Sequence, residues 1–236
     1  MKKALSLIMV FMVAVMWSAT GFSSSKYASG NIGMSWLDDS EAWESLDWTT
    51  APDGYKNSYD SGLTLTGALG CDFGDYRLEG ELGYQGGDMK SFTYVLDGED
   101  LYGEDLTGDV SILSLMVNGY YDIDLGSGVE LFPYVGVGVA QVKFDNVAAV
   151  FDNGEPNGEG HLEYEASEVT FAYQIGLGLG IPVSDGIMLD ARYRYFGTTE
   201  FTISDDIDPY WQRGEDNEYN LDMESHSGLI GLRVNF

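Results

Sequence analysis

Seven charged residues recur at alternate positions of strand-like segments, and together they could form ion pairs. They are Arg77, Glu79, Glu81, Asp190, Arg192, Arg194 and Arg233. Residues spaced by two along a β-strand point to the same face of the sheet. If that face is enclosed, guanidinium groups persist there only when carboxylates pair with them. The spacing therefore predicts a buried network of arginines and carboxylates.

The elements that would position these residues are eight segments in which apolar residues alternate with small or charged ones. The segments span residues 26–36, 62–73, 76–85, 110–124, 129–144, 169–182, 187–196 and 225–236. A period of two is typical of a strand with two unlike faces. A tilted strand that crosses a bilayer needs roughly 9 to 11 residues, so each segment is long enough to cross. The chain is therefore predicted to be all-β.

Glycines gather on the face that also carries the charges. Gly136, Gly138, Gly176, Gly178 and Gly180 all take this face. A soluble sandwich would turn its charged face toward water, where nothing requires small side chains. Because glycine weakens strands, its clustering indicates a steric cause, such as a narrow barrel interior. We therefore expect charged and small residues inside and apolar residues outside, facing lipid.

Short and long connections alternate strictly between the eight segments. The short ones lie near residues 74–75, 125–128 and 183–186, and the long ones near 37–61, 86–109, 145–168 and 197–224. Every long connection must then leave from the same end of the sheet. Membrane barrels have this asymmetry, with short periplasmic turns and long outer loops. The pattern predicts an eight-stranded antiparallel up-and-down transmembrane β-barrel with four long extracellular loops.

The N-terminal segment has the layout of a secretory signal peptide. Lys2 and Lys3 precede an apolar run at 4–17, and small residues follow at 18–21. The run is shorter than the roughly 20 residues of a membrane-spanning helix. We expect a signal peptide over residues 1–21, with cleavage between 21 and 25, and one barrel domain over 26–236. The single cysteine, Cys71, excludes an internal disulfide.

The C-terminal segment ends in Phe236, with apolar residues at every second position before it. Residues 231–236 (GLRVNF) resemble the signal that the barrel-assembly machinery reads. Residues 77–84, 118–122, 133–138 and 190–196 resemble the strand signatures of the opacity-type outer-membrane β-barrel family. The resemblance covers the strands and not the long connections. It implies an eight-stranded barrel in a Gram-negative outer membrane but no single activity, because members serve as surface antigens, adhesins and envelope proteins.

The four long connections hold 30 of the 39 acidic residues, against only Lys56, Lys90 and Arg213. Such loops repel nucleic acid. Their carboxylates could bind divalent cations, which would bridge them to lipopolysaccharide phosphates. The oxygen-rich stretches at 97–100 and 152–155 do not have the spacing of a twelve-residue calcium loop. Aromatic residues among the acids suit either a binding surface or the girdle at the membrane interface.

The sequence contains few candidates for catalytic residues. Of the two histidines, His161 lies in an acidic connection, and His226 stands between Ser225 and Ser227. Outer-membrane lipid A deacylases use a serine two positions after the histidine, where this chain has glycine, and adjacent residues point to opposite faces. No phosphate-binding loop and no Cys/His metal spacing occurs. We therefore expect no catalytic residue, cofactor or metal.

The expected function is that of a non-catalytic envelope component or surface interaction protein. An eight-stranded barrel has an interior just wide enough for side chains, which favours a polar plug over a gated pore. Two alternatives remain: a narrow porin-like channel and, less favoured, a lipid-modifying enzyme.

Overall fold

The computed structural model describes residues 25–44, 53–96, 99–152, 159–205 and 217–236, and the regular elements in them are all β-strands. The expected signal peptide at 1–21 lies outside these residues. No helix in the described ranges has the length and apolar character needed to cross a bilayer.

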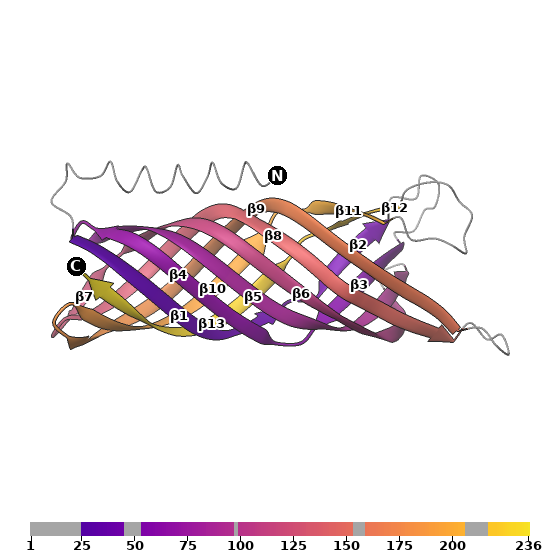
Figure 1. The fold of residues 1–236 in the computed structure, drawn as a ribbon, viewed down its shortest axis with the longest axis horizontal. Coiled ribbons are helices and arrows are strands. Elements are labelled where there is room, and N and C mark those ends of the chain that lie inside the picture. The colour runs from indigo at the N-terminus through magenta and orange to yellow at the C-terminus, as the bar shows by residue number, and fades with distance from the viewer. Residues whose placement is uncertain (1–24, 45–52, 97–98, 153–158, 206–216) are drawn as a thin grey trace.

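Eight strands form a closed antiparallel barrel (Figure 1). They are β1 (Ser25–Leu37), β4 (Gly62–Asp72), β5 (Tyr76–Leu96), β6 (Glu99–Tyr121), β8 (Val129–Asp152), β9 (Glu159–Ser184), β10 (Ile187–Thr198) and β13 (Glu224–Asn235). Each pairs with the next, and β1 pairs with β13 from Tyr27↔Asn235 to Leu37↔Ser225 to close the ring. The predicted fold class is confirmed.

Tight turns join the strands at one end of the barrel. Gly74 has a φ of +100°, and its amide donates to Asp72 Oδ1 at 2.8 Å. Gly126 repeats this arrangement with Asp124 Oδ1 at 2.7 Å, next to the short strand β7 (Ile123–Gly126). Glycine takes the left-handed conformation without steric cost, and an aspartate two residues earlier caps the turn.

The barrel wall has the predicted sidedness. On β5, Glu79 is 1% exposed and faces inward, whereas Leu82 is 55% exposed and faces outward. The interior is filled: a Cβ atom added at Gly178 would lie 2.1 Å from the Phe132 ring, and one at Gly176 would lie 2.3 Å from the Tyr134 ring. The clustered glycines therefore make room for two large aromatic side chains.

The four long connections differ from the expected loops, because most of their described residues lie in strands. Strands β5, β6, β8 and β9 run on past the closed barrel, and four short strands join them: β2 (Ser40–Glu44), β3 (Asp53–Tyr59), β11 (Phe201–Asp205) and β12 (Asn217–Leu221). Together they form a sheet in the order β11-β12-β2-β3-β5-β6-β8-β9. We call this part of the molecule the outer tier (Figure 1).

The polarity of the sheet inverts between the closed barrel and the outer tier. On β8, the inward face carries Tyr134 and Gly136 low in the barrel but Val142 and Phe144 above, while outward Lys143 is exposed. One buried apolar cluster fills the upper part of the closed barrel and continues into the outer tier, and it consists of Leu37, Tyr59, Met89, Val110, Ile112, Met116, Ala140, Val142, Phe144, Val147, Ala172, Phe196, Phe201, Ile203, Leu221 and Met223. Apolar residues face out where lipid surrounds the wall and face in where water does.

Candidate functional site

Arg77 occupies the turn end of the barrel interior. Its Nε donates to Asp122 Oδ2 at 2.7 Å and its Nη2 to Asp122 Oδ1 at 2.8 Å. The guanidinium also lies over the rings of Tyr120 and Phe132, 4.5 and 4.9 Å from their centroids. A two-pronged ion pair between aromatic faces holds the arginine in one orientation.

Arg192 is the centre of the charged network. Its Nη2 lies 3.2 Å from Asp190 Oδ2, and its Nη1 lies 3.8 Å from Glu79 Oε1 and 4.0 Å from Glu81 Oε2. Tyr120 links two of these groups, because its hydroxyl accepts from Arg192 Nη1 at 3.1 Å and donates to Glu79 Oε1 at 2.6 Å. One arginine therefore neutralises carboxylates from two strands that lie across the barrel, β5 and β10.

Arg194 and Arg233 extend the network toward the two ends of the barrel. Arg194 Nη1 lies 3.6 Å from Glu81 Oε1, and its Nη2 donates to Ser227 Oγ at 3.4 Å. Arg233 Nη2 lies 2.6 Å from Glu130 Oε2 and 3.3 Å from Asp190 Oδ1. The charged side chains thus form one continuous set along the barrel axis.

The structure buries all seven charged residues that the spacing singled out and joins six of them directly: Glu79, Glu81, Asp190, Arg192, Arg194 and Arg233. Arg77 pairs instead with Asp122, which was not among the seven charged residues predicted to form the network. Glu130, the second partner of Arg233, was also missed. Both carboxylates lie on the inward face of predicted segments (110–124 and 129–144), so a search of that face for every carboxylate could have found them.

Neutral side chains complete the layer above Arg192. Gln174 Nε2 donates to Asn118 Oδ1 at 2.6 Å and to Glu81 Oε1 at 3.2 Å. Farther out, the interior passes into the apolar cluster, where Met116, Ala140 and Phe196 are fully buried. The interior is therefore filled first by a charged layer and then by an apolar one.

His226 faces outward at the outer rim of the membrane wall. Its Nδ1 lies 2.6 Å from the Tyr193 hydroxyl, and its Nε2 lies 3.4 Å from Asp38 Oδ2. Ser227 is buried inside the barrel, so the two residues have opposite facings and do not form a base and nucleophile pair. His226 stacks on Tyr193, with ring centroids 5.9 Å apart, as part of an aromatic girdle.

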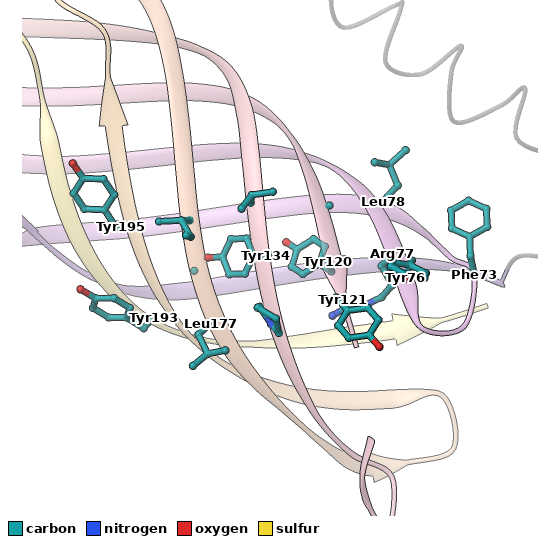
Figure 2. A pocket seen from close by; sticks show the side chains of 15 residues that line it. Phe73, Tyr76, Arg77, Leu78, Tyr120, Tyr121, Tyr134, Leu177, Tyr193 and Tyr195 are labelled. Carbon is teal, nitrogen blue, oxygen red and sulfur yellow. The ribbon is translucent and has the colours of Figure 1, made fainter. Parts of the chain in front are cut away.

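An open hollow of about 850 Å³ lies along the outer wall toward the turn end (Figure 2). Leu78, Gly119, Tyr121, Val135 and Leu177 contribute to its mostly apolar lining. Its position on the apolar outer surface suits lipid acyl chains. The sequence did not predict this hollow, because residues of several neighbouring strands line it and no single segment contains them.

The surface of the outer tier has few positive charges, and those described are paired. Lys56 lies 3.2 Å from Asp39, Lys90 lies 3.8 Å from Asp60, and Lys143 pairs with Asp145, whose hydrogen bond raises the pKa of the lysine. Across the described residues, no three metal-ligating side chains come together. Most of the stretch at 152–155, residues 97–98 of the other oxygen-rich stretch, and the side chain of His161 lie outside what the structure describes.

Comparison with known proteins agrees with this architecture. The chain is 30% identical over 194 residues to outer membrane protein PagN of Salmonella typhimurium, covering 79% of this chain and 76% of PagN. Its fold is similar to the crystal structure of OprG from Pseudomonas aeruginosa, with a TM-score of 0.59, 16% identity, and 91% and 97% of the two chains covered. It is also similar to the outer membrane protease OmpT of Escherichia coli, with a TM-score of 0.51, 9% identity, and 90% and 97% covered.

At these identities, the likeness to the two solved structures concerns the fold alone. The family described as outer membrane protein beta-barrel domain matches residues 5–236, nearly the whole chain. This protein therefore belongs to the outer membrane β-barrel family and is a protein of the outer membrane.

Proposed function

We propose that this protein is a non-catalytic surface protein whose plugged barrel anchors an acidic outer tier, and that partners bind to this tier. The observation that carries the proposal is the contrast between the two parts. The interior of the barrel is filled by ion pairs and then by apolar side chains, whereas the outer tier exposes unbalanced carboxylates to water.

The filled interior argues against the alternative of a narrow channel. A solute would have to displace Arg192 from three carboxylates and then pass the packed cluster around Met116 and Phe196. Separating buried ion pairs is costly. Purified protein in planar lipid bilayers is therefore expected to give no stable unitary currents. Reproducible single-channel steps, absent from a heat-denatured sample, would favour the channel instead.

The contacts of His226 favour a structural role for this side chain over a catalytic one. Its neighbours Tyr193 and Asp38 hold it by both ring nitrogens, and the nearest serine hydroxyls on its own strand face the barrel interior. One fold neighbour is a protease, so the fold by itself carries no argument about catalysis.

The charge of the outer tier indicates the chemistry of its partners. Carboxylates without matching cations attract positively charged polypeptides, and they attract divalent cations that bridge to lipopolysaccharide phosphates. They disfavour nucleic acid. Lipid, lipopolysaccharide and, during biogenesis, the barrel-assembly machinery complete the expected partners.

The test is binding of a fluorescent cationic polypeptide to the protein in nanodiscs. The comparison variant carries Asn or Gln at five exposed acids of the outer tier: Asp88, Asp109, Glu165, Glu168 and Glu200. Because this variant keeps the barrel and lowers the negative charge, we expect affinity to fall by about tenfold or more at low salt. Equal binding by both forms, or by empty nanodiscs, would contradict the proposal.

A further inference from the structure

Among the described strands, the outer tier is an open sheet that ends at β9 on one side and at β11 on the other. The described part of β9 pairs with β10 only from Ala172 onward, and β11 pairs only with β12. At the base of the opening, Thr199 N donates to Phe171 O at 2.9 Å, and Thr170 Oγ1 contacts the Thr199 backbone oxygen at 3.0 Å. Beyond this point the strands diverge: Figure 1 shows β9 running to the lower right and β11 lying at the upper right. We call the gap the β9–β11 seam.

Within the residues that the structure describes, one edge of β9 has no strand partner along residues 159–170, and at residue 171 the backbone oxygen accepts from Thr199 N. Among the described strands, no other has so long a run with a partner on one side only. Such an edge presents a row of free N–H and C=O groups, which can pair with a strand from another molecule. Lipid would not tolerate it, but the outer tier lies in water.

Both apolar and acidic side chains lie beside the seam. Phe201 and Ile203 of β11 belong to the apolar cluster, and Ala166 of β9 packs against it. Glu168 takes an inward position between Ala166 and buried Thr170, yet it is exposed, as is Glu165. A strand placed here would turn one face toward the apolar cluster and have carboxylates at its borders.

We propose that the β9–β11 seam binds an extended segment of another protein, rich in lysine or arginine, by adding it as a strand. The inference rests on the proposed function and specifies the site and the form of the partner. Backbone pairing to β9 would supply affinity, and alternate side chains would supply specificity. A second copy of this chain fits poorly, because both β9 edges would carry Glu165 and Glu168, and two acidic edges repel each other.

The experiment uses a synthetic ten-residue peptide that alternates valine and lysine, with the protein in nanodiscs. A matched peptide of the same sequence carries N-methyl groups on alternate backbone nitrogens, which removes donors without changing its charge. We expect the N-methylated peptide to bind at least about tenfold more weakly, since strand addition depends on backbone hydrogen bonds. Equal affinity of the two peptides would contradict strand addition at the β9–β11 seam. Electrostatic binding of cationic polypeptides by the outer tier would then still stand.

Two variants locate the site. E165K/E168K reverses the charge at the seam, whereas D88K/D109K makes the same change at a cross-strand pair of β5 and β6 within the paired sheet. We expect the first variant to lose peptide binding and the second to bind within a few fold of the unmodified protein. Equal loss in both would show that only total charge matters and would overturn the proposed site.

Amide exchange measured by NMR then reports on the backbone. Binding of the unmodified peptide should slow exchange at alternate amides of residues 165–171, and the N-methylated peptide should not. Peptide binding without protection of β9, or a doubling of particle mass through contact of two β9 edges, would overturn the inference. If neither peptide binds the unmodified protein more tightly than the variant with Asn or Gln at the five acids of the outer tier, the proposed function fails as well.

Discussion

Arg77 and Asp122 form a two-pronged ion pair at the turn end of the barrel, with both donor–acceptor distances below 3 Å. The arginine comes from the start of β5, and the aspartate follows the end of β6. Because β5 and β6 are neighbours, the pair ties the first turn of the barrel to the second. Asp122 N also donates to Asp75 O at 2.8 Å, which strengthens the same connection.

The first prediction concerns this pair. Arg77→Met should lower the free energy of unfolding by about 3–5 kcal/mol, because it leaves Asp122 without its counter-charge in a largely buried site. The double variant R77M/D122L should recover most of this loss. Urea unfolding in detergent, followed by tryptophan fluorescence, measures both. A single variant as stable as the unmodified protein would argue against a structural role for the pair.

The second prediction ranks the two arginines of β10. Arg192 lies near three carboxylates, and Arg194 near one, with its Nε and Nη1 making no hydrogen bond within the described residues. Reversing Arg192 to Glu should therefore destabilise the barrel more than reversing Arg194 to Glu. Loss of the folded gel band on stepwise heating reports the difference. The control is Lys143→Gln on the exposed surface of the outer tier, which should change stability by less than about 0.5 kcal/mol. Unchanged unfolding of the Arg192 variant would refute the ion-pair plug.

The third prediction tests the filled interior. Gly178→Ala should destabilise the barrel by about 1–3 kcal/mol, since its new methyl group would meet the Phe132 ring. Shortening the ring in G178A/F132L should relieve the overlap. Gly67→Ala is the matched control, because a Cβ there would meet nothing within 4 Å. Equal effects of the two alanine variants on thermal unfolding would show that strand propensity, and not packing, places the glycines.

The fourth prediction tests the inversion of polarity along β8. Val137 faces outward low on the strand, and Val142 faces inward above. Although the two residues lie on opposite faces, lysine at either should destabilise the protein, by about 2–4 kcal/mol for a lipid-facing position near the middle of the membrane. Asp109→Lys, on the wet surface of the outer tier, should be tolerated. A tolerated V142K would mean that the outer tier lacks an apolar core.

The fifth prediction concerns Phe236, which is 74% exposed and whose amide donates to Lys26 O at 2.8 Å. Deleting Phe236 should reduce the folded protein in outer-membrane fractions, measured by gel mobility with and without heating. Refolding of the purified variant into detergent separates two causes. Normal refolding with poor assembly in cells indicates a lost signal, whereas poor refolding indicates lost packing. Normal levels in cells would count against the assembly signal.

Period-two alternation is a local property, which is why the eight strands and their facing could be predicted from sequence. The segment at 76–85 needs no distant residue to show that Arg77, Glu79 and Glu81 share a face opposite Leu78 and Leu82. Alternating connection lengths then determined the antiparallel order. Particular partners could not be predicted, because Arg192 meets Glu79 from a strand more than 100 residues earlier.

The outer tier escaped prediction for a different reason. The alternation continues on β8 past Gln141, but the apolar residues change faces, so a search for one apolar face ends near residue 144. The strands there also depend on distant pairing: Tyr219 of β12 lies opposite Glu44 of β2, and Lys56 of β3 opposite Thr93 of β5.

The sequence by itself determined that this chain forms a membrane barrel with charged residues inside and acidic outer segments, because alternation, connection length and composition are written along the chain. Only the tertiary structure decided which carboxylate meets which arginine, that the outer segments build a second tier with an apolar core, and that one edge of β9 has no strand partner among the described residues along 159–170. Those features depend on strands meeting across the closed sheet, and backbone pairing between distant segments leaves little trace in the residues of either strand.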